Sequence, residues 1–104
     1  MPSVERMSPA QLQRHIHWLA RDSAAVMFTE HVLSRMKQRR ILPVEVLDVL
    51  RQGRIVRTPE PNVARGSLEC RMQRFLAGRE LAVVAAVSDA YPGVVVVTAM
   101  VLES

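Results

Sequence analysis

The sequence has few of the residue types that most often mark a functional site. Its 104 residues include one cysteine, four glycines, one Trp, one Tyr and two Phe. A lone Cys70 excludes an internal disulfide and gives no sign of an oxidising compartment. The glycines are scattered, so no phosphate-binding loop or dinucleotide fingerprint is present and no cofactor is expected. Because aromatics are scarce, the core must be built from aliphatic side chains and Met.

Metal-ligand spacing and long apolar runs are missing as well. His15 and His17 are two residues apart, which on a helix turns their side chains about 200° away from each other. They cannot share one metal ion, and no metal site is expected. No apolar run approaches the roughly 18 residues that a membrane helix needs, and the start lacks a signal-peptide core. We therefore expect a cytoplasmic protein that does not span a membrane.

The charge is positive and unevenly placed. The formal net charge is +4, and residues 1–58 carry 10 Lys and Arg against 5 Asp and Glu, a net of +5. Residues 59–104 carry 4 against 5, a net of −1. A basic surface attracts polyanions such as RNA or acidic partners. Solubility alone explains the same excess equally well.

The pattern of elements predicts an α+β domain with helices first and a sheet second. Ser8-Pro9 starts a helix, Thr29 caps a second over about 30–40, and Pro43 starts a third that ends before Gly53. Strands are expected at 54–58, 67–76, 81–87 and 94–102, which gives a roughly four-stranded antiparallel sheet. We expect one domain over 1–104, with 1–25 as a helical extension and 26–102 as the core.

Two regions of the expected sheet depart from simple alternation of apolar and polar residues. The segment from Pro59 to Gly66 contains prolines, Asn and Gly, and is predicted to be a loop. The last two strands are almost unbroken apolar runs, which is typical of strands covered on both faces. The helices at 30–52 can cover one face. The first helix, a second copy of the chain or a partner protein could cover the other.

One constellation on the second helix has chemical meaning. His31, Arg35 and Arg39 recur every four residues and so climb one side of the helix, followed by Arg40. Imidazole can transfer a proton near neutral pH, and the guanidinium group offers a planar fork to phosphate oxygens. The set suits a phosphodiester. A solvated basic helix face explains the same spacing.

The same stretch resembles a known family. The pattern Thr29-x-His31-x-x-x-Arg35-x-x-x-Arg39-Arg40-Ile41, followed by Pro43-Val-Glu-Val-Leu, is similar to the opening segment of the domain-of-unknown-function family 4258. The segment Val95-Val96-Val97-Thr98 is similar to its terminal threonine-bearing strand. The resemblance covers about residues 26–102. Arg40 stands where the family usually has Gly, and Val32 where it usually has Ala.

The resemblance implies a fold and a function. The family's element order resembles the RelE/barnase-like arrangement of RelE-like and BrnT-like toxin ribonucleases, which is an analogy of fold. It implies a metal-independent endoribonuclease with RNA as substrate and a cognate antitoxin as partner. Two alternatives remain open, a non-catalytic module that binds nucleic acid or protein and a structural homodimer. The implied catalytic residues are His31, Arg35 and Thr98, and the implied RNA contacts are Arg35, Arg39, Arg40 and Arg71.

Overall fold

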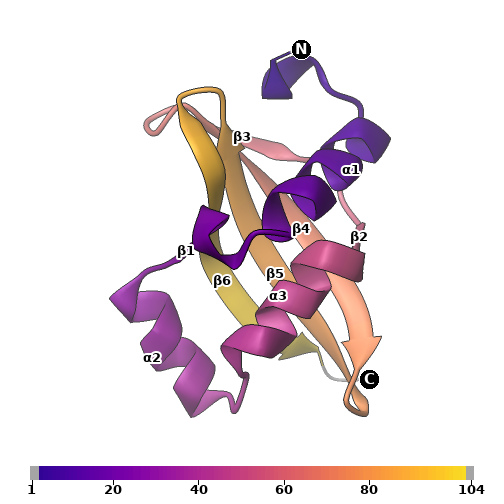
Figure 1. The fold of residues 1–104 in the computed structure, drawn as a ribbon, viewed down its shortest axis with the longest axis vertical. Helices are drawn as coiled ribbons and strands as arrows, with labels where there is room; N and C mark the ends of the chain where they lie inside the picture. Colours follow the sequence, from indigo (N-terminus) through magenta and orange to yellow (C-terminus); the bar gives the residue numbers. More distant parts are fainter. Residues whose placement is uncertain (1–2, 103–104) are drawn as a thin grey trace.

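The computed structural model describes residues 3–102, which form helices packed on a mostly antiparallel sheet (Figure 1). The expected α+β class and the order of helices before sheet are confirmed. The helices are α1 (Pro9–Ala20), α2 (Glu30–Gln38) and α3 (Pro43–Gln52), with two short 3-10 helices, η1 (Val4–Arg6) and η2 (Ser23–Ala25). The strands are β1 (Val26–Phe28), which lies between η2 and α2, and then β2 (Arg54–Ile55), β3 (Glu60–Asn62), β4 (Ser67–Leu76), β5 (Arg79–Ser88) and β6 (Tyr91–Leu102).

The sheet has six strands in the described residues, so the expectation of about four is corrected. Their order is β1-β6-β5-β4-β2, with β3 also paired to β4, and β1 runs parallel to β6. The extra strand β3 lies in the segment expected to be a loop. Its Pro61 pairs with Leu68 at the margin of the sheet, where a residue without an N–H group is tolerated. The expected strand 54–58 ends at Ile55.

The helix starts follow the local signals. The Ser8 side chain accepts a hydrogen bond from the Gln11 N–H at 3.2 Å, and the Gln11 side chain accepts one from the Ser8 N–H at 2.8 Å. The Thr29 hydroxyl accepts one from the Val32 N–H at 3.1 Å. These caps satisfy N–H groups that have no partner inside the helix. They fix where α1 and α2 begin.

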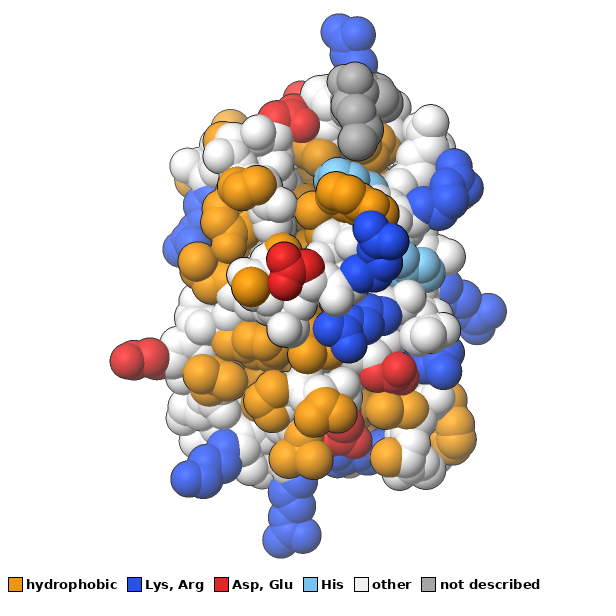
Figure 2. Space-filling model, in the orientation of Figure 1, with side chains coloured by type: hydrophobic (Ala, Val, Ile, Leu, Met, Phe, Trp, Pro, Cys, Tyr) orange, Lys and Arg blue, Asp and Glu red, His pale blue; other side chains and the backbone are white. Residues whose placement is uncertain are grey.

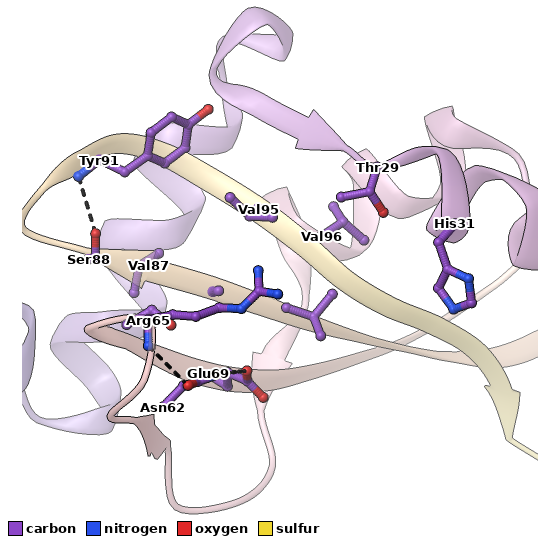
Figure 3. A pocket seen from close by; sticks show the side chains of 13 residues that line it. Thr29, His31, Asn62, Arg65, Glu69, Val87, Ser88, Tyr91, Val95 and Val96 are labelled. Carbon is purple, nitrogen blue, oxygen red and sulfur yellow. Dashed lines mark hydrogen bonds between the residues drawn. The ribbon is translucent and has the colours of Figure 1, made fainter.

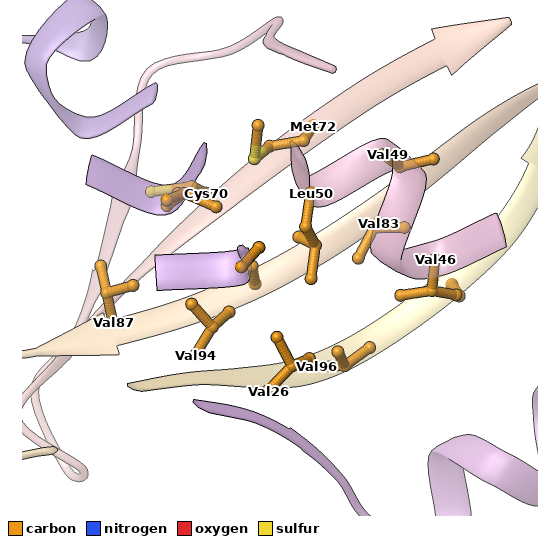
Figure 4. Packing of buried hydrophobic residues seen from close by; sticks show 14 of the residues in the cluster. Val26, Val46, Val49, Leu50, Cys70, Met72, Val83, Val87, Val94 and Val96 are labelled. Atoms are coloured by element: carbon orange, nitrogen blue, oxygen red, sulfur yellow. The ribbon is translucent and has the colours of Figure 1, made fainter. Parts of the chain in front are cut away.

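One face of the sheet carries the core. In Figure 1, α1 and α3 cross in front of the strands, and α1 packs against α3. Figure 4 shows side chains of α3 meeting side chains of the central strands. Fully buried residues of these elements include Leu12, Ile16, Val46, Val49, Leu50, Met72, Val83, Val94 and Val96. This aliphatic packing is what the scarcity of aromatics predicts.

The opposite face of the sheet is not covered by any helix of residues 3–102. Along β5, Val83, Ala85 and Val87 are buried, whereas Val84 and Ala86 between them are only half-buried. Of the three covers considered for this face, the first helix is excluded, since α1 joins the face that α3 already covers. A second copy of the chain and a partner protein stay open. The alternation was hidden in the sequence because Val and Ala occupy both faces.

No helix among the described residues is long and apolar enough to cross a membrane.

Figure 2 shows the helical side of the molecule, where hydrophobic side chains are interspersed with Lys and Arg. The sheet face with the half-buried alternate residues faces away from the viewer, because α1 and α3 lie in front of the strands in this orientation. That uncovered face holds the candidate functional site.

Candidate functional site

A cavity with a volume of about 590 Å³ lies on the uncovered face of the sheet. Its floor is formed by small apolar residues of β5 and β6, including Ala86 and Val95. Its walls come from the start of α2, the loop after β3 and the turn between β5 and β6 (Figure 3). The titratable or charged side chains that line it are those of His31, Arg65, Glu69 and Tyr91.

His31 reaches the cavity because of where α2 begins. The Thr29 cap starts the helix immediately after β1, and α2 then packs beside β6. His31 lies in the first helical turn, is solvent-exposed, and lines the cavity with Thr29. In Figure 3 its imidazole projects from the helix on the side of the uncovered sheet face. His31, the residue that the sequence suggested for proton transfer, therefore lines this cavity.

Glu69 enters the cavity from the sheet. It alternates with the buried Leu68 and Cys70 on β4, so its side chain points to the uncovered face. The amide of Asn62 donates to the Glu69 carboxylate at 3.2 Å, which leaves the other carboxylate oxygen available. The Arg65 N–H donates to the Asn62 side chain at 3.3 Å. These bonds hold the loop over the sheet.

Arg65 contributes the cation of this cavity. Its side chain is exposed, and Figure 3 shows it extending from the loop over the sheet. Tyr91 closes the other end, where its N–H donates to the Ser88 hydroxyl at 3.2 Å. A proton donor or acceptor, a carboxylate and a guanidinium thus share one solvent-accessible cavity with an aromatic ring at its margin.

A second, smaller cavity adjoins the first. Its volume is about 240 Å³, and it is lined by His31, Val32, Arg35, Arg39, Val97 and Thr98. His31 and Val97 line both cavities. The structure therefore brings together four of the site residues that sequence reasoning selected. Two guanidinium groups and a hydroxyl in a small cavity form a donor-rich surface suited to an anion.

Thr98 faces the second cavity because of a bulge in β6. Val84 pairs with Thr98 while Ala85 pairs with Val96, which leaves Val97 as the extra residue. An extra residue shifts the alternation of the strand by one position. Both Val97 and Thr98 are consequently accessible on the uncovered face, while Ala99 is buried.

Arg39 has a structural contact as well as a place in the second cavity. One of its guanidinium nitrogens donates to the Ala99 carbonyl at 2.8 Å. β1 pairs with β6 only as far as Val96, so this carbonyl lies beyond the end of that pairing. Arg39 supplies the missing donor at the sheet edge, and only part of its guanidinium remains for a ligand.

Arg40 and Arg71 line neither cavity. Arg40 has a φ of 57°, the left-handed conformation that glycine adopts without strain. Its carbonyl accepts a hydrogen bond from Arg79, which also donates to the buried Glu45 carboxylate at 3.1 Å. Arg71 lies on the uncovered face in one row with Val84 and Thr98. Its Nε is buried and has no hydrogen-bond partner between residues 3 and 102.

Cys70 lies on the opposite side of β4 from the site. It is fully buried, and burial raises the pKa of its thiol to about 11. The neutral thiol is a packing group and not a nucleophile at physiological pH. Within residues 3–102, no group of three His, Cys, Asp or Glu side chains is placed to hold a metal ion.

Sequence reasoning missed Arg65, Glu69 and Tyr91. Glu69 carried a usable signal, because strand alternation places it on the same face as Arg71. Arg65 lies in a loop and Tyr91 beside a turn, where no periodicity points to a partner. Only the pairing of β3 with β4 and of β5 with β6 brings these segments to the same cavity.

These features define a class: an α+β domain whose uncovered sheet face bears a titratable, partly basic cavity. The model of the family described as a domain of unknown function (DUF4258) matches residues 28–101. The chain belongs to this family, and α1 lies outside the matched region. No curated protein and no solved structure matches the chain.

Proposed function

We propose that this protein is a metal-independent endoribonuclease acting on free RNA. The observation that carries the proposal is that His31, Glu69 and Arg65 line one cavity on the uncovered sheet face. Two groups able to exchange protons and a cation are what cleavage by the ribose 2′-hydroxyl requires. The adjoining cavity with Arg35 and Thr98 adds donors for a phosphate group.

Each side chain has a role in the proposed reaction. Glu69 takes the proton from the 2′-hydroxyl, and that oxygen attacks the adjacent phosphorus. The bond from phosphorus to the 5′-oxygen breaks, and His31 donates a proton to that leaving oxygen. Arg65 and Arg35 stabilise the additional negative charge on the phosphate oxygens. The products are a 2′,3′-cyclic phosphate and a 5′-hydroxyl.

The family resemblance supports this reading at the level of fold. Helices followed by a mostly antiparallel sheet with one uncovered face are compatible with a RelE/barnase-like arrangement. In this proposal, residues 26–102 form the catalytic core and residues 1–25 an added helical extension of the same domain. A cognate antitoxin would act by covering the uncovered face. Thr98 would orient a phosphate oxygen, with Arg39 and Arg71 as further RNA contacts.

Variant kinetics on labelled RNA in EDTA test the proposal. Loss of one proton-transfer group costs about 100-fold or more, so His31→Ala and Glu69→Gln should each lower kcat by at least that factor. His17→Gln is the matched control, because His17 lies on α1 and contacts the Gly53 carbonyl instead. Melting curves establish that all variants are folded. Equal cleavage by wild type and His31→Ala would refute the proposal.

The second candidate is a non-catalytic RNA-binding module using the same basic surface. It is favoured by the engagement of Arg39 with the Ala99 carbonyl and of Glu69 with Asn62, which are stabilising contacts of a fixed surface. In that case wild type binds RNA without cleaving it, and Arg35→Gln and Arg65→Gln reduce both the affinity and its salt dependence. His31→Ala would then leave binding unchanged.

A further inference from the structure

The only tryptophan of the chain is displayed to solvent on α1. Trp18 is 55% exposed, although the rest of its helix packs Leu12, Ile16 and Leu19 into the core. The Arg21 guanidinium lies over the indole ring, 5.4 Å from its centroid. The Arg21 Nε also donates to the Trp18 carbonyl at 3.3 Å. The ring is therefore held in position at the surface without being used for the core.

Cavities continue from the candidate site to this tryptophan. Tyr91 and Ser88 line the large cavity and also a third one, of about 230 Å³, that contains His15 and Trp18. Trp18 and Pro92 in turn line both this cavity and a fourth, of about 470 Å³, that contains Arg21. The surface path passes over the turn between β5 and β6.

The path alternates aromatic rings with cationic or titratable nitrogen groups. From the site outward it presents Arg65, Tyr91, His15, Trp18 and Arg21. Beyond the large cavity, the two acidic side chains beside the path each accept a backbone N–H: Asp89 accepts from the Val4 N–H at 3.0 Å, and Asp22 from the Ala24 N–H at 3.0 Å. Single-stranded nucleic acid is bound by this combination, since bases stack on rings while cations follow the backbone.

We propose that Trp18 is a base-stacking subsite for single-stranded RNA that extends from the large cavity across Tyr91 onto α1. This inference rests on the proposed function for the identity of the ligand. It adds that substrates several nucleotides long bind more tightly than short ones. It also assigns a role to α1, which the family match does not include.

Binding of an uncleavable RNA tests the subsite separately from catalysis. The probe is a mixed-sequence 2′-O-methyl decamer, whose blocked 2′-oxygens prevent cleavage. Because Trp18 is the sole tryptophan, its fluorescence reports on this position alone. We expect the decamer to quench that fluorescence in wild type. By anisotropy of labelled decamer, Trp18→Leu should weaken binding about 5- to 100-fold, and Trp18→Phe should restore most of the affinity.

Two further variants support the interpretation. Arg21→Gln removes the cation above the ring on an exposed side chain and should also weaken decamer binding. Phe75→Leu is the matched control, because Phe75 is a 65% exposed aromatic near the β4–β5 turn at the other end of the sheet. It should leave the decamer affinity unchanged. Melting curves for each variant establish that the fold is retained.

The outcomes separate this inference from the proposed function. Quenching in wild type and a loss of affinity in Trp18→Leu, without any cleavage of RNA by wild type, would support the subsite and refute the nuclease. Cleavage without quenching would support the nuclease and overturn the subsite. Unchanged affinity in Trp18→Leu overturns it too. Equal quenching by inorganic polyphosphate would show attraction of charge without stacking, and would likewise overturn it.

Discussion

Replacing Arg40 with glycine should stabilise the protein. Arg40 has a φ of 57°, a conformation that costs a residue with a Cβ about 1–2 kcal/mol. Glycine avoids that cost but loses about 0.5–1 kcal/mol more conformational entropy on folding. The carbonyl that accepts from Arg79 is retained. The net gain in the free energy of unfolding is about 0–1.5 kcal/mol. Its central value, about 0.75 kcal/mol, corresponds to a rise in Tm of about 3–6 °C.

Thermal unfolding followed by circular dichroism measures this gain. Arg40→Ala is the matched control, because it removes the same charge but keeps the strained conformation. The reasoning predicts that Arg40→Gly melts above wild type and that Arg40→Ala does not. A lower Tm for Arg40→Gly, or an equal rise in both variants, would refute it. RNA affinity measured on the same two variants shows whether the Arg40 guanidinium contacts RNA.

Three further predictions concern stability. Gly53→Ala should destabilise the fold by about 3 kcal/mol in urea unfolding, because a Cβ there would lie 2.4 and 2.9 Å from two backbone oxygens; an unchanged midpoint would contradict this. The raised pKa of Cys70 means that the folded state holds its proton longer than the unfolded state. Unfolding free energy should therefore fall as pH rises from about 9 to about 11, by roughly 3 kcal/mol more in wild type than in a Cys70→Ala variant; parallel pH curves for the two would contradict this. Arg79→Met should lower the free energy of unfolding by about 1–3 kcal/mol, because it leaves the buried Glu45 carboxylate without its cation. Adding Glu45→Gln to that variant should restore part of the loss in the same urea assay. An unchanged unfolding free energy in Arg79→Met would contradict a stabilising role for this ion pair.

The parts of the fold that were predicted from the sequence are those governed by local chemistry. Ser8 and Thr29 cap their helices because a hydroxyl before a helix satisfies its first N–H groups. The strands expected at 67–76 and 81–87 are joined by a tight turn at Ala77 and Gly78, where both residues adopt positive φ. β3 was missed because its pairing depends on β4 and not on its own residues, which include Pro61.

In the candidate site, too, the residues predicted from the sequence are those whose placement depends on local spacing. The spacing of His31, Arg35 and Arg39 on one helix side is local, and their shared surface was predicted from it. The contributions of Glu69 and Arg65 depend on how β4 and the preceding loop fold back beside α2, which no sequence period encodes. The uncovered sheet face was hidden because apolar residues fill both faces of β5 and β6.

Product analysis is the most direct test of the central claim. The purified wild-type protein is incubated in EDTA with RNA and, separately, with the same sequence carrying 2′-deoxyribose at every position, and the ends are identified by mass spectrometry. The account predicts 2′,3′-cyclic phosphate and 5′-hydroxyl ends from the RNA, no cleavage of the deoxy strand, and loss of cleavage in folded His31→Ala. Cleavage of both strands, 3′-hydroxyl ends, or no cleavage of RNA at micromolar protein would contradict it.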